Sequence, residues 1–188
     1  IRALGDVSGI SLGGCAETEL LNSYAYAYYA GGGSNNPVAF IASDWLGIVS
    51  SVLARNCRFE TIRNSAVEHE TYGACVSGGS AVFEHCKMTV NQMAAYAYAA
   101  ALGVTGVTKS VHVIGGYLYA DGNEPWAIRN NLATVTVKLA GVTYDRSLVY
   151  GLTEDVPDNF RLTSIDANGR VDVTGILGIN ASSAISSI

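Results

Sequence analysis

Tyrosine and alanine alternate in two short stretches of the chain, residues 22–30 (NSYAYAYYA) and 94–101 (AAYAYAAA). On a helix, residues two apart point in nearly opposite directions, whereas on a strand they share one face. Both stretches are therefore predicted to be strands that carry tyrosine on one face and alanine on the other. The small face suits a tightly packed interior. The large rings with a polar tip suit a sugar or a neighbouring chain.

A six-residue pattern recurs through the middle of the chain. Its copies are 55–60 (RNCRFE), 84–89 (EHCKMT), 114–119 (IGGYLY) and 139–144 (LAGVTY), and 21–26 (LNSYAY) is a weaker one. The third position is small and the fifth is mostly apolar, so both are predicted to point inward. The fourth and sixth positions are polar or aromatic and are predicted to point outward.

Short apolar stretches separated by Gly, Asn or Ser lie between these copies. A repeat of this kind without helical periodicity cannot bury its apolar face alone, but stacked coils can. Equivalent residues of successive coils would then lie about 4.8 Å apart, with Cys57 above Cys86. A β-sandwich is the alternative, but a sandwich does not predict that one pattern recurs at nearly constant spacing.

The segments RNCRF and EHCKM resemble rungs of right-handed parallel β-helices, the pectate-lyase-like and phage tailspike group. The resemblance covers about residues 20 to 145. It implies an all-β fold, a right-handed parallel β-helix that serves as a rigid scaffold for binding or cleaving carbohydrate. For tailspikes it further implies a homotrimer on the virion tail, outside the cell. No catalytic motif of the group is present to be carried over.

The C-terminal part is expected to differ from the coils. Residues 151–159 (GLTEDVPDN) form a polar break, and DANG at 166–169 between two alternating runs predicts a β-hairpin. The residue pattern of this segment resembles that of the C-terminal segments of phage tail fibres, where three chains intertwine. We therefore expect an N-terminal cap or stalk end at 1–19, the β-helix at 20–150, and a hairpin and trimerisation segment at 151–188.

The net charge, the cysteine spacing and the motifs argue against several classes of function. The net charge of −5 argues against a nucleic-acid surface, and no apolar run is long enough to insert into a membrane. The four cysteines lack the spacing of metal ligands and are predicted to be free thiols. We expect no metal and no cofactor. Ser-His-Asp spacing, a phosphate-binding loop and HExxH are also missing from the sequence.

The outward positions of the repeat form two predicted columns of candidate glycan-binding residues. Cations, a carboxylate and tyrosine rings on a rigid sheet suit an anionic or neutral glycan, although an intersubunit surface is enriched in the same residues. One column is Arg58, Lys87, Tyr117 and Val142, and the other is Glu60, Thr89, Tyr119 and Tyr144.

Two predicted loops add aromatic rings beside carboxylates, a combination that suits sugar binding. Trp45 follows Asp44, and Trp126 ends a loop that contains Asp121 and Glu124. Arg129 lies close to the second loop in the sequence and could hold a sugar acid.

Catalysis would require a pair of carboxylates. Glu68 and Glu70 share one face of a predicted strand, where they could act as acid and base on a glycosidic bond. The candidate catalytic carboxylates are Asp44, Glu60, Glu68, Glu70 and Asp121.

The sequence thus favours the distal part of a phage tailspike or tail fibre that recognises bacterial surface polysaccharide as a homotrimer. One alternative is a polysaccharide depolymerase, a glycosidase or lyase, on the same scaffold. Another is a purely structural tip that drives folding and trimerisation.

Overall fold

The computed structural model describes residues 1–5, 8–30, 36–44, 48–64, 70–92, 98–121, 124–130, 135–145, 170–174 and 177–179. Every regular element within these residues is a β-strand. Accordingly, the described part of the chain has no helix long and apolar enough to cross a membrane.

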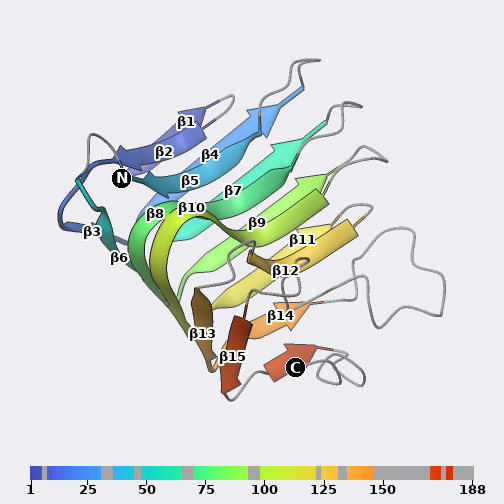
Figure 1. The fold of residues 1–188 in the computed structure, drawn as a ribbon. Coiled ribbons are helices and arrows are strands. Elements are labelled where there is room, and N and C mark those ends of the chain that lie inside the picture. The colour runs from blue at the N-terminus through green and yellow to red at the C-terminus, as the bar shows by residue number, and fades with distance from the viewer. Residues whose placement is uncertain are drawn as a thin grey trace.

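The strands form two parallel sheets (Figure 1). Sheet A contains, in spatial order, β1 (Arg2–Gly5), β4 (Tyr24–Tyr29), β7 (Arg58–Arg63), β9 (Lys87–Gln92), β11 (Tyr117–Asp121), β14 (Thr143–Asp145) and β16 (Leu177–Ile179). Sheet B contains β2 (Ser8–Gly13), β5 (Val38–Ser43), β8 (Thr71–Glu84), β10 (Tyr98–Ile114), β13 (Thr136–Ala140) and β15 (Arg170–Thr174), together with β3 (Thr18–Leu21), β6 (Ser51–Arg55) and β12 (Glu124–Asn130).

The chain passes alternately through the two sheets and stacks each coil on the one before it. The long strand β8 shows the arrangement, because its first half pairs with β5 and its second half with β6. Both halves of β8 also pair with β10 of the following coil. All of these pairings are parallel, so the predicted parallel β-helix is confirmed.

The interior is built from ladders of equivalent side chains. Phe59 stacks on Phe40 with ring centroids 4.8 Å apart, and Phe83 meets both rings edge-on. Ala25 and Ala27 of β4 are fully buried, as the alternating pattern predicts, while Tyr28 of the same strand is 42% exposed. The small alanine side chains let β4 lie close against the aromatic interior.

One corner of the coil places a residue in the left-handed backbone conformation in turn after turn of the described residues. Its φ lies between 47° and 63° in five successive coils. The backbone N–H of four of these residues donates to a carbonyl of the next coil at 2.7–3.0 Å. The corner residues are Asn22, Asn56, His85, Gly115 and Gly141.

This corner corrects the predicted alignment of the last repeat by one residue. Thr143, not Val142, pairs with Tyr117 across β11 and β14, and Tyr144 pairs with Leu118. Val142 is fully buried and takes the inward position of the third repeat residue. The predicted alignment matched Gly141 with Gly116, but Gly141 occupies the left-handed corner equivalent to Gly115, and Leu139 and Ala140 already pair with Val113 and Ile114. The side chain of Tyr144 lies outside the described residues.

The C-terminal strands continue the stack. β15 pairs in parallel with β13, and β16 pairs in parallel with β14. The second run of the predicted hairpin therefore adds to both sheets. Residues 160–169, which hold the first run and the DANG turn, lie outside the described residues.

Candidate functional site

The outer face of sheet A carries a row of charged and aromatic side chains in register. Arg2, Tyr24, Arg58, Lys87 and Tyr117 occupy equivalent positions on five neighbouring strands, and we call them the cation–tyrosine row. The cations lie over the rings: Arg58 Cζ is 5.5 Å from the Tyr24 centroid, and Lys87 Nζ is 5.1 Å from that of Tyr117. Arg2 Cζ lies 6.0 Å from the Tyr24 centroid.

Two further rows lie beside the cation–tyrosine row because alternate residues of a strand share one face. The residues two positions along β7, β9 and β11 are Glu60, Thr89 and Tyr119. Two positions further along the same strands, the residues are Ile62, Asn91 and Asp121.

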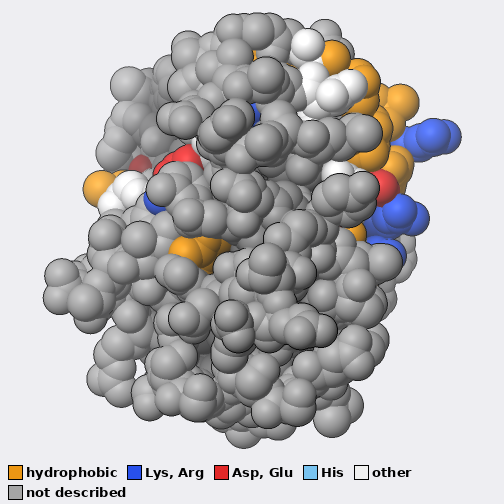
Figure 2. Space-filling model, turned by 90° about the vertical axis from the view of Figure 1, so that its right-hand side faces the viewer, with side chains coloured by type: hydrophobic (Ala, Val, Ile, Leu, Met, Phe, Trp, Pro, Cys, Tyr) orange, Lys and Arg blue, Asp and Glu red, His pale blue; other side chains and the backbone are white. Residues whose placement is uncertain are grey.

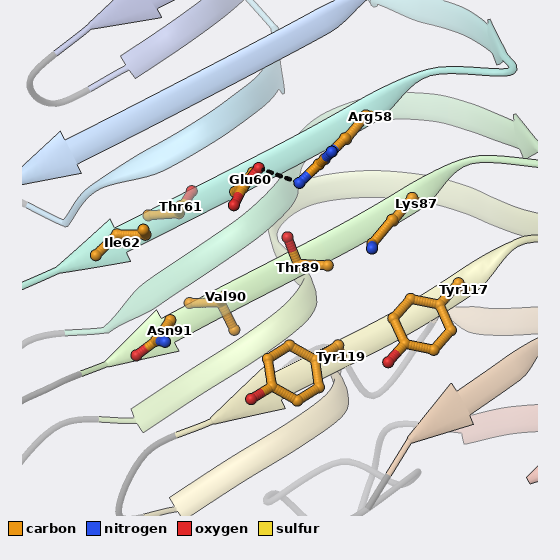
Figure 3. A pocket seen from close by; sticks show the side chains of 10 residues that line it. All are labelled: Arg58, Glu60, Thr61, Ile62, Lys87, Thr89, Val90, Asn91, Tyr117 and Tyr119. Atoms are coloured by element: carbon orange, nitrogen blue, oxygen red, sulfur yellow. Dashed lines mark hydrogen bonds and ion pairs between the residues drawn. The ribbon is translucent and has the colours of Figure 1, made fainter. Parts of the chain in front are cut away.

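These rows surround a pocket of about 230 Å³ on the outer face of sheet A (Figure 3). In the figure, the side chains of Arg58, Lys87 and Tyr117 follow one another across three strands, with Tyr119 next to Tyr117 along β11. The residues that line the pocket are Arg58, Glu60, Thr61, Ile62, Lys87, Thr89, Val90, Asn91, Tyr117 and Tyr119.

Glu60 accepts two side-chain hydrogen bonds at the charged end of this pocket. Its Oε2 accepts a hydrogen bond from Arg58 Nη2 at 2.7 Å and another from the Tyr24 hydroxyl at 3.1 Å. Partial burial, and then the negative charge of Glu60, raise the pKa of Tyr24, so this hydroxyl stays a donor. Lys87 has no carboxylate partner among the described residues, so its ammonium leaves the row with excess positive charge.

A second hollow of about 390 Å³ continues the same face toward β1. Tyr24 and Tyr26 stack there at 6.4 Å, and Leu4 is 63% exposed. Figure 2 shows Lys and Arg side chains beside hydrophobic ones along one edge of the molecule. The hollow is lined by Arg2, Leu4, Gly5, Tyr24, Tyr26 and Tyr28.

The interpretation of Trp126 as an exposed sugar-stacking ring is wrong. Trp126 belongs to β12 rather than to a loop, and its side chain is only 1% exposed. It pairs with Ala100 and packs in a small apolar cluster with Val38 and Tyr72. Its strand places Trp126 on the outer side of sheet B, and its low exposure shows that other residues cover the ring there. Glu124 begins the same strand, and its side chain lies outside the described residues.

Arg129 is also unavailable to hold a sugar acid. The residue is 9% exposed, and its Nη1 donates to Glu70 Oε1 in an ion pair. The other oxygen of Glu70 accepts a hydrogen bond from the Tyr72 hydroxyl. Burial, followed by the hydrogen bond to Glu70, raises the pKa of Tyr72 well above its usual range. Glu70 therefore holds Tyr72 and Arg129 together above sheet B.

The other candidate carboxylates are spread over the coil. Asp44 Oδ1 accepts the Ser50 backbone N–H at 2.9 Å and so closes the corner between β5 and β6. Asp121 ends β11 beside Asn91 on sheet A. Asp44, Glu60 and Glu70 thus have different partners in different parts of the coil. Trp45 and Glu68 lie outside the described residues.

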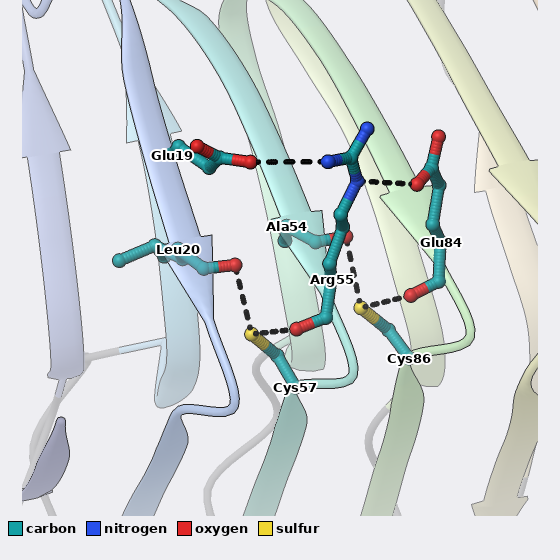
Figure 4. Close-up of polar contacts among 7 residues, drawn as sticks. All are labelled: Glu19, Leu20, Ala54, Arg55, Cys57, Glu84 and Cys86. Carbon is teal, nitrogen blue, oxygen red and sulfur yellow. Dashed lines mark hydrogen bonds and ion pairs between the residues drawn. The ribbon is translucent and has the colours of Figure 1, made fainter.

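Cys57 and Cys86 stack in successive coils, as predicted, and both are free thiols (Figure 4). Their sulfurs lie 3.4 Å from the Leu20 carbonyl and 3.3 Å from the Ala54 carbonyl, respectively, each one coil earlier. No cluster of three His, Cys, Asp or Glu suited to a metal ion occurs among the described residues.

Beside these thiols, Arg55 joins three coils on the surface of sheet B (Figure 4). Its Nη1 lies 3.2 Å from Glu19, and its Nε lies 2.5 Å from Glu84. Because all three side chains are partly exposed, each pair adds at most about 1 kcal/mol of stability. The sequence analysis missed this bridge, although spacings of 36 and 29 residues from Arg55 place both carboxylates on its neighbouring coils.

Sequence reasoning also missed Arg2 and Asn91 as members of the site, and it gave Tyr24 as a sugar or chain contact without placing it in the column of Arg58. Tyr24 was available from the weak copy at 21–26, and Asn91 follows from extending the alternation two residues past Thr89.

Comparison with protein-family models, with curated proteins and with solved structures finds no match for this chain.

Proposed function

We propose that the outer face of sheet A binds carbohydrate, and that the chain recognises bacterial surface polysaccharide as the distal part of a phage tailspike or tail fibre. The observation that carries the proposal is the pocket on β7, β9 and β11. There tyrosine rings, a hydroxyl, an amide and charged groups converge on one rigid surface.

The chemistry of the pocket suits a sugar. Aromatic rings stack on the C–H faces of pyranose rings, and Tyr117 and Tyr119 supply two rings on one strand. Thr89 and Asn91 supply a hydroxyl and an amide on the neighbouring strand, which can bond to sugar hydroxyls. Because both strands belong to a continuous parallel sheet, these groups are already ordered before a ligand arrives, which favours affinity.

Binding is better supported than cleavage. A glycosidase needs a pair of carboxyl groups that flank one glycosidic bond, one as acid and the other as base or nucleophile. Glu60 is the carboxylate that lines the pocket, and it is held by Arg58 and Tyr24. Both contacts already engage this carboxylate, and the described residues that line the pocket include no second carboxylate to work with it.

The homotrimer remains part of the proposal and rests on the tailspike resemblance, with exposed Leu4 and Tyr28 as candidate contact residues on the same face. Light scattering in dilute solution tests it. A particle of three times 19.7 kDa is expected, and a stable monomer would contradict the tail-fibre assignment.

Carbohydrate binding itself is tested on an array of bacterial surface polysaccharides. Tyr117→Ala and Tyr119→Ala are expected to weaken binding by about two- to tenfold each, the range for loss of one aromatic contact. Ile114→Ala is a suitable control, because Ile114 is exposed but lies on β10 of sheet B. If neither tyrosine variant differs from this control for any bound glycan, the pocket is not the binding site.

A further inference from the structure

The cation–tyrosine row indicates the charge of the ligand. We propose that the row binds the carboxylates of an acidic polysaccharide, which lies across the strands of sheet A and along the axis of the coil. This inference rests on the proposed function and specifies its substrate class. Lys87 is the residue that makes the direct contact with a sugar carboxylate.

The charge balance of the row is the first observation. Arg2, Arg58 and Lys87 place three cations on it, and Glu60 of the next row offsets one of them. This local excess of positive charge stands on a chain whose net charge is −5. A polyanion would thus be attracted to this face and repelled by the chain as a whole.

The second observation is that the cations differ in what they can still bind. Arg58 Nη2 is engaged by Glu60 at 2.7 Å, so this contact fixes one edge of the guanidinium group. Lys87 is exposed, and within the described residues its ammonium contacts only the face of Tyr117. The ammonium group has three donors, so a carboxylate can bind it without displacing a protein partner.

The third observation is the direction of the row. Arg58 and Lys87 are hydrogen-bonded neighbours on β7 and β9, and Tyr117 follows on β11. Neighbouring strands lie about 4.8 Å apart, so the row presents a cation or a ring at short, regular intervals along the axis. A linear polysaccharide along this line can place a carboxylate near Lys87 and a sugar face on Tyr117 at once. A ligand that ran along a single strand would meet only one residue of the row.

A neutral polysaccharide fits the row less well. It would cover Arg58 and Lys87 with groups that cannot offset their charge, and burying a charge without compensation is unfavourable. The same cations could also bind sulfate or phosphate groups on a glycan. The experiment therefore has to compare carboxylates with other anions as well as with neutral sugars.

The test uses the whole chain and an array of uronic-acid and sialic-acid oligosaccharides. Each is printed beside its carboxyl-reduced counterpart and beside sulfated and phosphorylated oligosaccharides. Binding is compared at 50 mM and 500 mM NaCl for the wild type, Lys87→Gln and the control Lys138→Gln. Lys138 is an exposed lysine of β13 on sheet B and is matched in chemistry.

We expect the acidic sugars to bind, their carboxyl-reduced forms to bind at least about fivefold more weakly, and the higher salt concentration to reduce affinity. Lys87→Gln should lower affinity for acidic sugars about fivefold, whereas Lys138→Gln should leave it unchanged.

Equal binding of acidic and reduced forms, with a response to Tyr117→Ala, would overturn the acidic specificity but keep the proposed function. Preference for sulfated or phosphorylated sugars over carboxylates would also overturn it. Binding to no glycan of either array would contradict both proposals.

Discussion

Asn56 and His85 occupy the same corner of successive coils and share a left-handed backbone, with φ of 51° and 53°. The Asn56 N–H donates to the Glu84 carbonyl at 2.9 Å, and the His85 N–H donates to the Ile114 carbonyl at 2.8 Å. Asparagine tolerates this conformation better than most residues, whereas a β-branched side chain strongly resists it.

We therefore expect His85→Asn to leave the free energy of unfolding nearly unchanged and His85→Val to lower it by about 1–2 kcal/mol. Urea denaturation followed by circular dichroism measures both values. If the valine variant were as stable as the asparagine variant, backbone strain at residue 85 would not contribute to the free energy of unfolding.

Gly116 and Gly141 separate two effects of adding a methyl group. Gly141 has a φ of 61°, and nothing lies within 4 Å of a Cβ placed on it. Gly116 has a φ of 92°, and its Cβ would meet the Cys86 carbonyl oxygen at 2.2 Å.

Gly141→Ala should thus cost about 1 kcal/mol for the backbone alone, and Gly116→Ala should cost at least about 2 kcal/mol more. The same denaturation experiment gives the difference. Equal losses of unfolding free energy would mean that the backbone at Cys86 shifts at little cost to make room for the added methyl group.

The ion pair between Glu70 and Arg129 supports the covered patch above sheet B. The Arg129 side chain is 11% exposed, so Glu70→Gln would leave a buried guanidinium without its carboxylate. We expect this variant to lose about 2–3 kcal/mol.

Adding Arg129→Met should restore part of that loss, because the buried guanidinium that lost the Glu70 carboxylate is then removed. A double-mutant cycle of unfolding free energies measures the recovery. If the double variant were as unstable as the sum of the single ones, the pair would not act as a unit. Glycan binding should be unchanged in all three variants, because these residues lie away from the pocket on sheet A.

Cys75 should make the fold sensitive to alkaline pH. Burial raises the pKa of its thiol from 9.0 to about 12. A pKa that is higher in the folded state stabilises the fold fully below pH 9, and this contribution is lost as the pH rises from 9 toward 12.

The free energy of unfolding should fall by up to about 1.4 kcal/mol per pH unit over this range. Cys75→Ala should make that slope shallower, and the slope that remains comes from other groups whose pKa is raised in the fold, among them Cys86 and Tyr72. An unchanged slope in the alanine variant would assign the alkaline sensitivity to another group.

The parallel coil was predictable because side-chain alternation and repeat spacing are both visible in the sequence. The Tyr24–Tyr29 strand shows this most clearly, since Ala25 and Ala27 pack inward, while Tyr29, on the alanine face, is buried as well. The columns Arg58–Lys87–Tyr117 and Glu60–Thr89–Tyr119 followed from the same spacing and are found in register.

The predictions that failed concern the alignment of the last repeat and the burial of two side chains. The last repeat was aligned one residue out of register because Gly141 was matched with Gly116 as the small third position, whereas it is equivalent to the left-handed corner residue Gly115. Trp126 was misplaced because alternation assigns a side to a residue but says nothing about what covers that side. The burial of Arg129 depends on Glu70, which lies 59 residues earlier in the sequence, and no local pattern reveals such a contact.

The separation of inward and outward ladders has an evolutionary consequence. A substitution at Lys87 or Tyr117 changes the surface without touching Phe59 or Met88, whose side chains fill the interior. Each coil also contributes its own position to the outer row. Selection could therefore retune recognition one coil at a time, while the inner ladders keep every intermediate variant foldable.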